Sequence, residues 1–92
     1  MRFEWDEAKN RVNIRKRRID FVDLPPLFDR PMRVRLDARR EYGEDRMIGI
    51  GWLRESVVVV VFVEKGNDTI RIISARKATR HERERFREEI GH

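Results

Sequence analysis

The chain has 92 residues, enough for one domain with a single core, and its 39% hydrophobic residues can form that core although 42% of the residues are charged. It contains no cysteine, which excludes disulfides, thiolate metal sites and cysteine nucleophiles and fits a reducing cytoplasm. Its longest apolar run, Val57–Val63, is too short to cross a membrane, and the net charge of +5 favours a phosphate-bearing or acidic partner.

The segment that follows Asp6 predicts a helix. Asp6 is an N-cap candidate, because its carboxylate can accept hydrogen bonds from the free amides of the next turn. We expect the helix to run to Arg18. Ala8, Val12 and Ile19 are spaced as a thin apolar stripe that would pack on the core.

The stretch DFVDLPPLFDRP, residues 20–31, predicts a second and shorter helix. Pro25 and Pro26 cannot lie inside a helix, because each lacks an amide donor and crowds the preceding turn. They fit the first turn of a helix whose N-cap is Asp23, since the amides of a first turn have no helical partner. We therefore expect a short helix that ends near Asp29.

Four strands are expected next, at residues 32–36, 46–52, 57–63 and 69–74. Apolar residues alternate with polar or small ones in the first two, which is typical of strands with one buried face. The third, VVVVVFV, is apolar on both faces and predicts a central strand that is covered on each side. Short connections between the last three strands predict an antiparallel meander.

The end of the chain predicts a last helix. Thr79 and Glu82 form a capping-box pattern, in which the hydroxyl and the carboxylate each accept from a free amide, so this helix begins near Arg80. Phe86 and Ile90 lie one turn apart and are expected to face the core. The elements together predict an α+β domain in which N-terminal helices and a C-terminal helix pack on a four-stranded antiparallel sheet.

Residue types exclude most catalytic constellations. His81 and His92 are the only histidines, so a multi-histidine zinc site is excluded, and no glycine-rich phosphate loop follows a strand. Carboxylates of the last helix alternate with arginines at helical spacing, which more often indicates surface ion pairs than acid–base catalysis. A capping role is favoured for Glu82, and a solvated or supporting role for His81.

Positive charge gathers at two places. Between Lys9 and Arg18 the chain has basic residues and no acidic one, a pattern that a solvated helix face would also show. Arg71, Arg76 and Lys77 lie on the last strand and its exit, where a solubilising role explains them less well. An arginine fork can hold an RNA phosphate or stabilise charge on a phosphorane, and the sequence leaves both roles open.

Four segments carry a resemblance to a known family, in the same order over nearly the whole chain. They are FEWDEAKNRVNIRK at residues 3–16, GEDR at 43–46, IGIG at 48–51 and IRIISARKATRHERERF at 70–86. The chain resembles the BrnT toxin family of bacterial type II toxin–antitoxin systems. This resemblance implies a RelE-like α+β fold and an RNA-cleaving toxin that inhibits translation.

The resemblance also implies partners and a mechanism. A BrnA-type antitoxin would neutralise the toxin and carry a DNA-binding domain, so that operator DNA is contacted only through the antitoxin. No metal or cofactor is implied, because the 2′-hydroxyl of RNA attacks the neighbouring phosphate while basic side chains stabilise the transition state. We therefore expect a cytoplasmic, metal-independent endoribonuclease. The alternative is a non-catalytic basic module that only binds the antitoxin or a nucleic acid.

Three features depart from the family pattern. The second helix of many relatives lacks prolines like Pro25 and Pro26. Arg17 stands where many relatives have histidine, and Phe86 stands where many have tyrosine. Acid–base roles of those two residues would be lost here, so that either His81 substitutes or catalysis depends on electrostatics alone.

The expected site follows from the arginines and the resemblance together. Arg76 and Arg80 are expected to stabilise the phosphate and the transition state, and Ser74 to orient the phosphate. Supporting cations are expected at Arg46 and Lys16. The RNA backbone is expected to contact Arg33, Arg35, Arg71 and Lys77.

Overall fold

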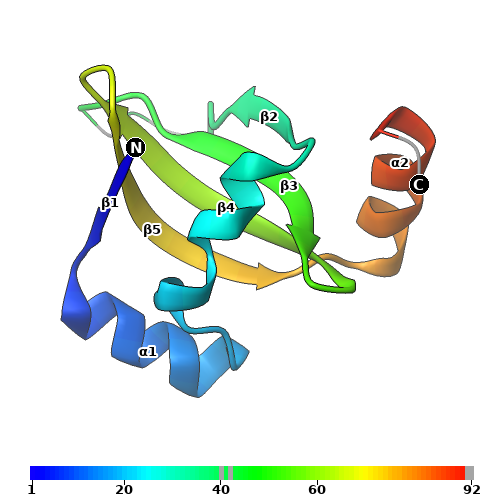
Figure 1. Cartoon of the computed structure of the whole chain (residues 1–92), viewed down its shortest axis with the longest axis horizontal. Coiled ribbons are helices and arrows are strands. Elements are labelled where there is room, and N and C mark those ends of the chain that lie inside the picture. The colour runs from blue at the N-terminus through cyan, green and yellow to red at the C-terminus, as the bar shows by residue number, and fades with distance from the viewer. Residues whose placement is uncertain (40, 42, 91–92) are drawn as a thin grey trace.

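The computed structural model describes residues 1–39, 41 and 43–90, which form a five-stranded sheet in the order β1-β5-β4-β3-β2 with helices beside it (Figure 1). None of the helices in these ranges is long and apolar enough to span a membrane. The strands are β1 (Arg2–Trp5), β2 (Arg33–Leu36), β3 (Met47–Leu53), β4 (Ser56–Lys65) and β5 (Thr69–Lys77), and the helices are α1 (Glu7–Arg17), the 3₁₀ helices η1 (Phe21–Asp23) and η2 (Pro25–Asp29), and α2 (Arg80–Ile90).

The sheet corrects the prediction of four antiparallel strands. The meander of β3, β4 and β5 is antiparallel as predicted, and β2 adds to it in the same sense. The additional strand β1 pairs in parallel with β5, with Phe3 opposite Ile70 and Trp5 opposite Ile72. β1 has only four residues and its partner lies near the other end of the chain, so no local pattern separates it from the approach to the first helix.

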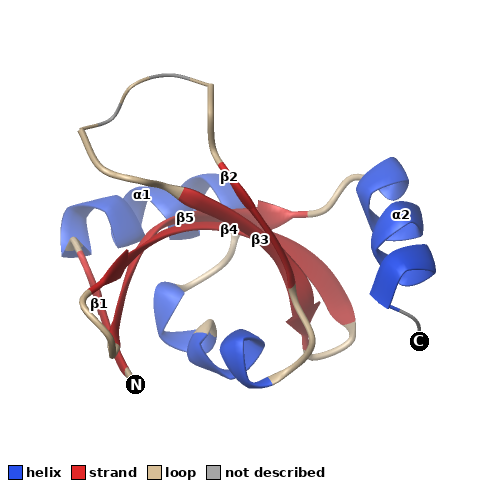
Figure 2. Cartoon of the chain, turned by 90° about the horizontal axis from the view of Figure 1, so that it is seen from above, coloured by secondary structure: helices blue, strands red, loops and turns tan. Residues whose placement is uncertain are grey.

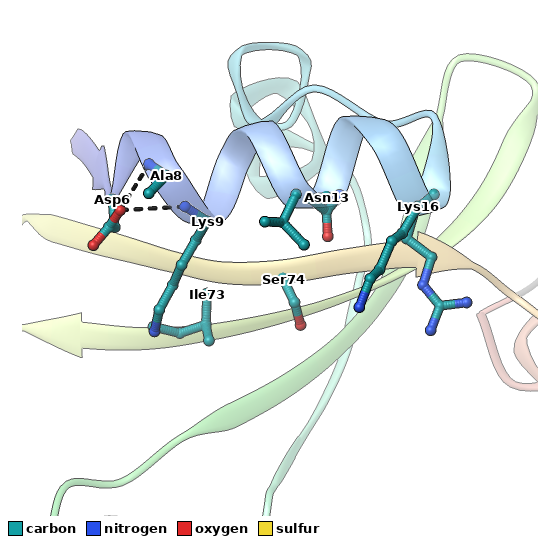
Figure 3. Close-up of a pocket in the computed structure, with 9 residues that line it drawn as sticks. Asp6, Ala8, Lys9, Asn13, Lys16, Ile73 and Ser74 are labelled. Atoms are coloured by element: carbon teal, nitrogen blue, oxygen red, sulfur yellow. Dashed lines mark hydrogen bonds between the residues drawn. The ribbon is translucent and has the colours of Figure 1, made fainter.

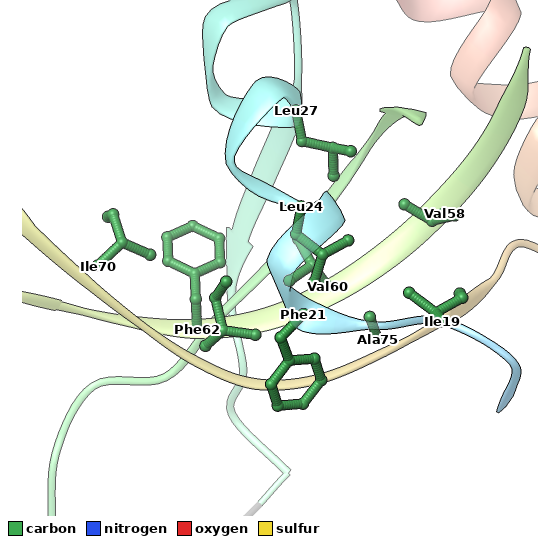
Figure 4. Close-up of a cluster of buried hydrophobic side chains, with 10 residues drawn as sticks. Ile19, Phe21, Leu24, Leu27, Val58, Val60, Phe62, Ile70 and Ala75 are labelled. Atoms are coloured by element: carbon green, nitrogen blue, oxygen red, sulfur yellow. The ribbon is translucent and has the colours of Figure 1, made fainter. Parts of the chain in front are cut away.

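The central strand β4 is covered on both faces, as its apolar sequence predicts. On one face Val58, Val60 and Phe62 pack with Phe21 of η1 and with Leu27, inside the curve of the sheet (Figures 2 and 4). Each of these five side chains is at most 2% exposed. This cluster is the main core of the domain, and it attaches the two 3₁₀ helices to the sheet.

A second cluster lies on the opposite face of the sheet. Val57 and Val59 of β4 pack there with Ile48 of β3 and with Phe86 of α2. Phe86 is 1% exposed and stacks edge-on against Trp52, as expected for an inward residue of the last helix. Figure 2 shows α2 at one end of this face and α1 at its β5 side. We call the part of the face between them, where Val61 and Ser74 are half-buried, the open face.

Helix α1 corrects the prediction of an apolar stripe. Asp6 caps it as predicted, but the helix ends at Arg17 and Arg18 adopts a left-handed backbone with φ of 61°, which leaves Ile19 outside the helix. Val12 is 39% exposed, whereas the buried residues of α1 are Asn10 and Asn13. The helix is therefore attached through polar side chains rather than through an apolar face.

The two asparagines bond to backbone groups. Asn13 donates to the carbonyl of Ile19 (3.0 Å) and accepts from the amide of Ala75 on β5 (3.1 Å), while Asn10 accepts from the amide of Phe21 (2.9 Å). β1 pairs with β5 only as far as Ile72, so the edge of β5 beyond it is open. Asn13 satisfies one amide on that edge, and α1 covers the edge.

The proline-containing segment forms two 3₁₀ helices, with a correction to the predicted cap. Pro25 and Pro26 occupy the first turn of η2, which ends at Asp29 as predicted. The expected N-cap Asp23 is instead the last residue of η1, and it is the carboxylate of Asp20 that caps η1 by accepting from the amide of Val22 (3.1 Å). Two short helices let the chain turn twice and place both Phe21 and Leu27 in the core.

The capping box of α2 is confirmed. The amide of Glu82 donates to the hydroxyl of Thr79 (3.1 Å), and the amide of Thr79 donates to the carboxylate of Glu82 (2.8 Å). The helix begins at Arg80, as predicted. This cap fixes the direction of the chain directly after β5 ends.

Candidate active site

An irregularity in β5 determines which side chains reach the open face. Val61 of β4 pairs with Ser74 whereas its neighbour Phe62 pairs with Ile72, so Ile73 is an extra residue in β5, a β-bulge. Ile72 and Ala75 belong to the main core. Without the extra residue, Ser74 would point to the same face as Ile72, because side chains alternate along a strand. The bulge therefore turns Ser74 to the open face.

Ser74 lies in a pocket on this open face, which we call the Ser74 pocket. Its volume is about 260 Å³, and its floor is formed by valines of β4 and an isoleucine of β3. Four guanidinium groups come together around it from four segments, and none of the described lining residues is acidic. The lining residues are Asn13, Arg17, Arg35, Arg39, Ile48, Val59, Val61, Ser74, Ala75 and Arg76.

Arg76 is held in this pocket by a carboxylate. Its two terminal nitrogens donate to the two oxygens of Glu82 at 2.8 and 2.9 Å, and one of them also donates to the carbonyl of Lys77 (3.2 Å). The hydrogen bond from Arg76 lowers the pKa of Glu82 from 4.5 to about 2, and the bond to Glu82 raises the pKa of Arg76. Both groups stay charged, and the carboxylate that caps α2 also orients Arg76.

Arg39 is oriented in the same way. Its Nε and one terminal nitrogen donate to the two oxygens of Asp37, each at 2.8 Å. Asp37 is 4% exposed, so its charge needs such a partner. For Arg17 and Arg35, by contrast, the part of the chain that the structure describes supplies no carboxylate within ion-pair distance. Two of the four guanidinium groups are thus pre-oriented, and two have free charge for an anion.

A second pocket adjoins the first across Arg35 and Ile48, which line both; we call it the His81 pocket. Its volume is about 330 Å³ and it lies between β2 and α2. The Arg76–Glu82 pair separates the two, because Arg76 lines one pocket and Glu82 the other. The lining residues are Arg33, Arg35, Ile48, Ile50, His81, Glu82, Arg85 and Phe86.

A third pocket, the α1 groove, adjoins the Ser74 pocket on its other side. It has a volume of about 420 Å³ and lies between α1 and β5. Figure 3 shows Lys9 and Lys16 extending from α1 past Ile73 and Ser74 of β5. The lining residues are Asp6, Ala8, Lys9, Val12, Asn13, Lys16, Arg17, Ile73 and Ser74.

The three pockets bring together six of the ten residues expected from the sequence. Ser74, Arg76 and Arg35 line the Ser74 pocket. Arg35, Arg33 and His81 line the His81 pocket, and Lys16 lines the α1 groove together with Ser74. Residues that are far apart in the sequence thus share one continuous basic surface.

The other four expected residues line none of these three pockets. Arg80 is paired at the surface with Glu84 at 3.1 Å, and its side chain is 86% exposed. Arg71 lies 3.9 Å from Glu4 on β1. Lys77 is exposed at the end of β5, and the partly buried Arg46 precedes β3, with its Nε 3.9 Å from Glu44.

Sequence reasoning missed three residues of the Ser74 pocket. Arg17 belongs to the basic run of α1 and to the departures from the family pattern, but the sequence assigns it no role in the site. Asn13 lies in the segment FEWDEAKNRVNIRK, whose resemblance to the family assigns it no role in the site. Arg39 lies in a polar loop, and its place in the pocket depends on the buried Asp37, which no sequence pattern indicates.

Comparisons with known proteins decide the family. A family model described as the ribonuclease toxin BrnT of type II toxin–antitoxin systems matches residues 5–82. The chain belongs to this family. Among solved structures, the crystal structure of the Brucella abortus ribonuclease toxin BrnT is similar, with a TM-score of 0.68 and 29% sequence identity over 87% of this chain and 99% of that chain. The curated proteins include no significant match.

Membership in the BrnT family implies an RNA target and an antitoxin partner, since the family comprises ribonuclease toxins of type II systems. The matched segment contains every residue that lines the Ser74 pocket and ends at Glu82. Within residues 1–39, 41 and 43–90, no three histidine, cysteine, aspartate or glutamate side chains are grouped so that they can hold a metal ion. The polar side chains that line the pocket are four arginines, the hydroxyl of Ser74 and the amide of Asn13.

Proposed function

We propose that this BrnT chain is a metal-independent endoribonuclease that cleaves RNA through attack of a 2′-hydroxyl on the neighbouring phosphate. The observation that supports this most is the Ser74 pocket, where four guanidinium groups surround a hydroxyl and no described lining residue is acidic. A phosphate in this pocket would meet cations from several sides. Arginine forks suit such an anion, because their donors match the geometry of phosphate oxygens.

In the proposed reaction, the 2′-oxygen forms a bond to phosphorus and the bond to the 5′-oxygen of the next nucleotide breaks. The products are a 2′,3′-cyclic phosphate and a 5′-hydroxyl. The phosphorane between them carries additional negative charge, and Arg76, with its orientation set by Glu82, would stabilise that charge without reorganisation. Ser74 would orient a phosphate oxygen. The 2′-hydroxyl releases its proton to water, and the leaving 5′-oxygen receives one, with His81 of the adjoining pocket as the candidate relay.

The proposed roles follow the three pockets. Lys16, which lines the α1 groove together with Ser74, would support the catalytic cations, while Arg33 and Arg35 would hold the RNA backbone. Arg80 pairs with Glu84 at the surface, so the proposal places it outside the catalytic group. We place Arg46 outside that group as well.

In the cell, such cleavage would inhibit translation in the cytoplasm. The antitoxin partner implied by the family is proposed to be of the BrnA type, with a DNA-binding domain that contacts the operator. The fold is proposed to be RelE-like, with β1 as an addition to the antiparallel strands. Co-expression with the product of the neighbouring gene should restore growth if that product is the antitoxin.

One observation favours the alternative, a non-catalytic binding module. Three of the five N–H donors of Arg76 bond to Glu82 and to the carbonyl of Lys77, which leaves two for a phosphate. In that alternative the basic surface binds the antitoxin or RNA and breaks no bond.

Incubation of the purified protein with end-labelled single-stranded RNA separates the two functions. Cleavage in the presence of EDTA, with products that end in 2′,3′-cyclic phosphate, supports the ribonuclease. Retarded RNA without cleavage supports the binding module. Activity that EDTA abolishes and magnesium restores would contradict the metal-independent mechanism.

A further inference from the structure

The α1 groove has a composition that the cleavage reaction does not require. Its walls include Ala8 and Val12 of α1 and Ile73 of β5, and Lys9 and Lys16 lie on the helix above them (Figure 3). Val12 is 39% exposed although it is apolar. The groove therefore combines an open apolar surface with cations.

The bulge of β5 links this groove to the catalytic chemistry. It turns Ser74 to the open face, and Ile73 and Ser74 both line the groove. Asn13, Arg17 and Ser74 line both the groove and the Ser74 pocket. An RNA strand with one phosphate in the Ser74 pocket would therefore place the neighbouring nucleotide in the α1 groove.

The chemistry of the groove fits one unpaired nucleotide. A base that is not stacked in a helix offers a flat, weakly polar face, and the adjacent backbone offers a phosphate. The apolar walls suit the base, and the ammonium groups of Lys9 and Lys16 suit the phosphate. Asp6 is acidic, but its carboxylate caps α1 by accepting from the amides of Ala8 (2.8 Å) and Lys9 (3.2 Å).

We propose that the α1 groove is a subsite for an unpaired nucleotide next to the scissile phosphate, with the base against Val12 and Ile73 and its phosphate near Lys9. The inference rests on the proposed ribonuclease function and adds a substrate class, single-stranded RNA that extends beyond the cleaved dinucleotide. Double-stranded RNA is excluded from this subsite, because a paired base cannot turn into the groove.

The first test compares substrates with the unmodified protein. A single-stranded pentanucleotide should be cleaved with a kcat/KM about tenfold above that of the central dinucleotide, because only the longer RNA can place a nucleotide in the groove. Two further pentanucleotides carry an abasic nucleotide, one on the 5′ side of the cleaved bond and the other on the 3′ side. Only the substrate whose abasic position falls in the groove should lose the tenfold advantage. Equal cleavage of all these RNAs would overturn the subsite.

The second test compares variants on the pentanucleotide. Lys9→Ala should raise KM by about tenfold and reduce the slope of log affinity against log salt by about 0.7, the value for one lost phosphate contact. Val12→Asp, at an exposed position, should weaken binding further. Arg15→Ala is the matched control, because Arg15 is an exposed cation of α1 that lines none of the three pockets. Melting temperatures check that each variant is folded.

The outcomes separate this inference from the proposed function. If the parent cleaves RNA and both Lys9→Ala and Val12→Asp keep its KM, the subsite alone is overturned. Lack of cleavage by the parent overturns both. Loss of antitoxin binding in these variants, with cleavage unchanged, overturns the subsite and assigns the groove to an acidic segment of the antitoxin.

Discussion

Replacement of Glu82 by glutamine tests the central feature of the site, the fork between Glu82 and Arg76. Glutamine retains the shape of the side chain and one carbonyl oxygen, which can still accept from the amide of Thr79. It loses the negative charge, and its amide group faces a donor of Arg76 where the second oxygen was. The substitution thus removes the ion pair while the cap of α2 is largely kept.

The structure allows the loss of stability in Glu82→Gln to be estimated. A pKa that falls from 4.5 to about 2 on folding corresponds to about 3 kcal/mol of folding free energy. The side chains of Arg76 and Glu82 are 39% and 27% exposed, so solvent screens the pair. We therefore expect Glu82→Gln to lower the free energy of unfolding by about 1–2 kcal/mol at pH 7.

The stability contributed by Glu82 should depend on pH. Because folding lowers the pKa of Glu82, the stabilisation is fully present above the unfolded value near 4.5 and is lost as the pH falls toward about 2. Urea unfolding of the parent and of Glu82→Gln should therefore differ at pH 7 and converge between pH 4.5 and the lower limit of the native state. A difference that is the same at pH 7 and pH 3.5 would refute the assignment of the stabilisation to this carboxylate.

Catalysis should respond to the same substitution. With Arg76 no longer oriented by a carboxylate, kcat for RNA cleavage should fall more than KM rises, and Glu82→Asp, which keeps the charge on a shorter side chain, should recover part of the loss. If Glu82 has only a structural role, Glu82→Gln should lower the melting temperature but should not lower kcat more than it raises KM.

Three further predictions concern the groups around the pocket. Arg76→Ala should reduce RNA cleavage about a hundredfold, as for loss of one donor to a transition-state oxyanion, and abolish growth arrest on induction. It should also destabilise the protein by about 1–2 kcal/mol, because it leaves Glu82 without its partner, whereas Arg80→Ala should be close to the parent in both measurements. A folded Arg76→Ala protein that remains toxic would remove Arg76 from the catalytic group. Asn13→Leu should cost about 2 kcal/mol in urea unfolding, since the buried amide of Ala75 loses its acceptor, and a cost below about 0.5 kcal/mol would contradict the proposed attachment of α1. RNA affinity should fall with salt by about 0.7 log units per log unit for each phosphate contacted, and a flat dependence in filter binding would exclude the basic surface as the RNA site.

Local sequence patterns were sufficient where neighbouring residues decide the structure. The capping box of Thr79 and Glu82 and the cap at Asp6 each depend on residues within one turn, so their geometry follows from the sequence. The apolar run of β4 likewise required burial on both faces, whichever elements provided the cover.

The sequence predicted which residue types meet at the end of β5 but not all of the residues that line the Ser74 pocket, and their catalytic roles stay predictions. Arg76 at the end of β5 does lie beside other arginines in the Ser74 pocket. Arg80 does not line this pocket, because its side chain points to solvent. The orientation of Arg76 is determined by the bidentate contact with Glu82 and by the bulge at Ile73, which changes the face on which Ser74 lies. Neither feature has a signal in local composition.

By itself, the sequence determined the family, the α+β class, the start of α2 and the basic character of the domain, because these depend on residue types and on contacts between near neighbours. The tertiary structure alone decided that β1 pairs with β5, that α1 is attached through Asn10 and Asn13, and that Arg17 and Arg39 join the Ser74 pocket. Each of these depends on hydrogen bonds or packing between segments far apart in the chain, and such pairings form only when the whole sheet has brought the segments together.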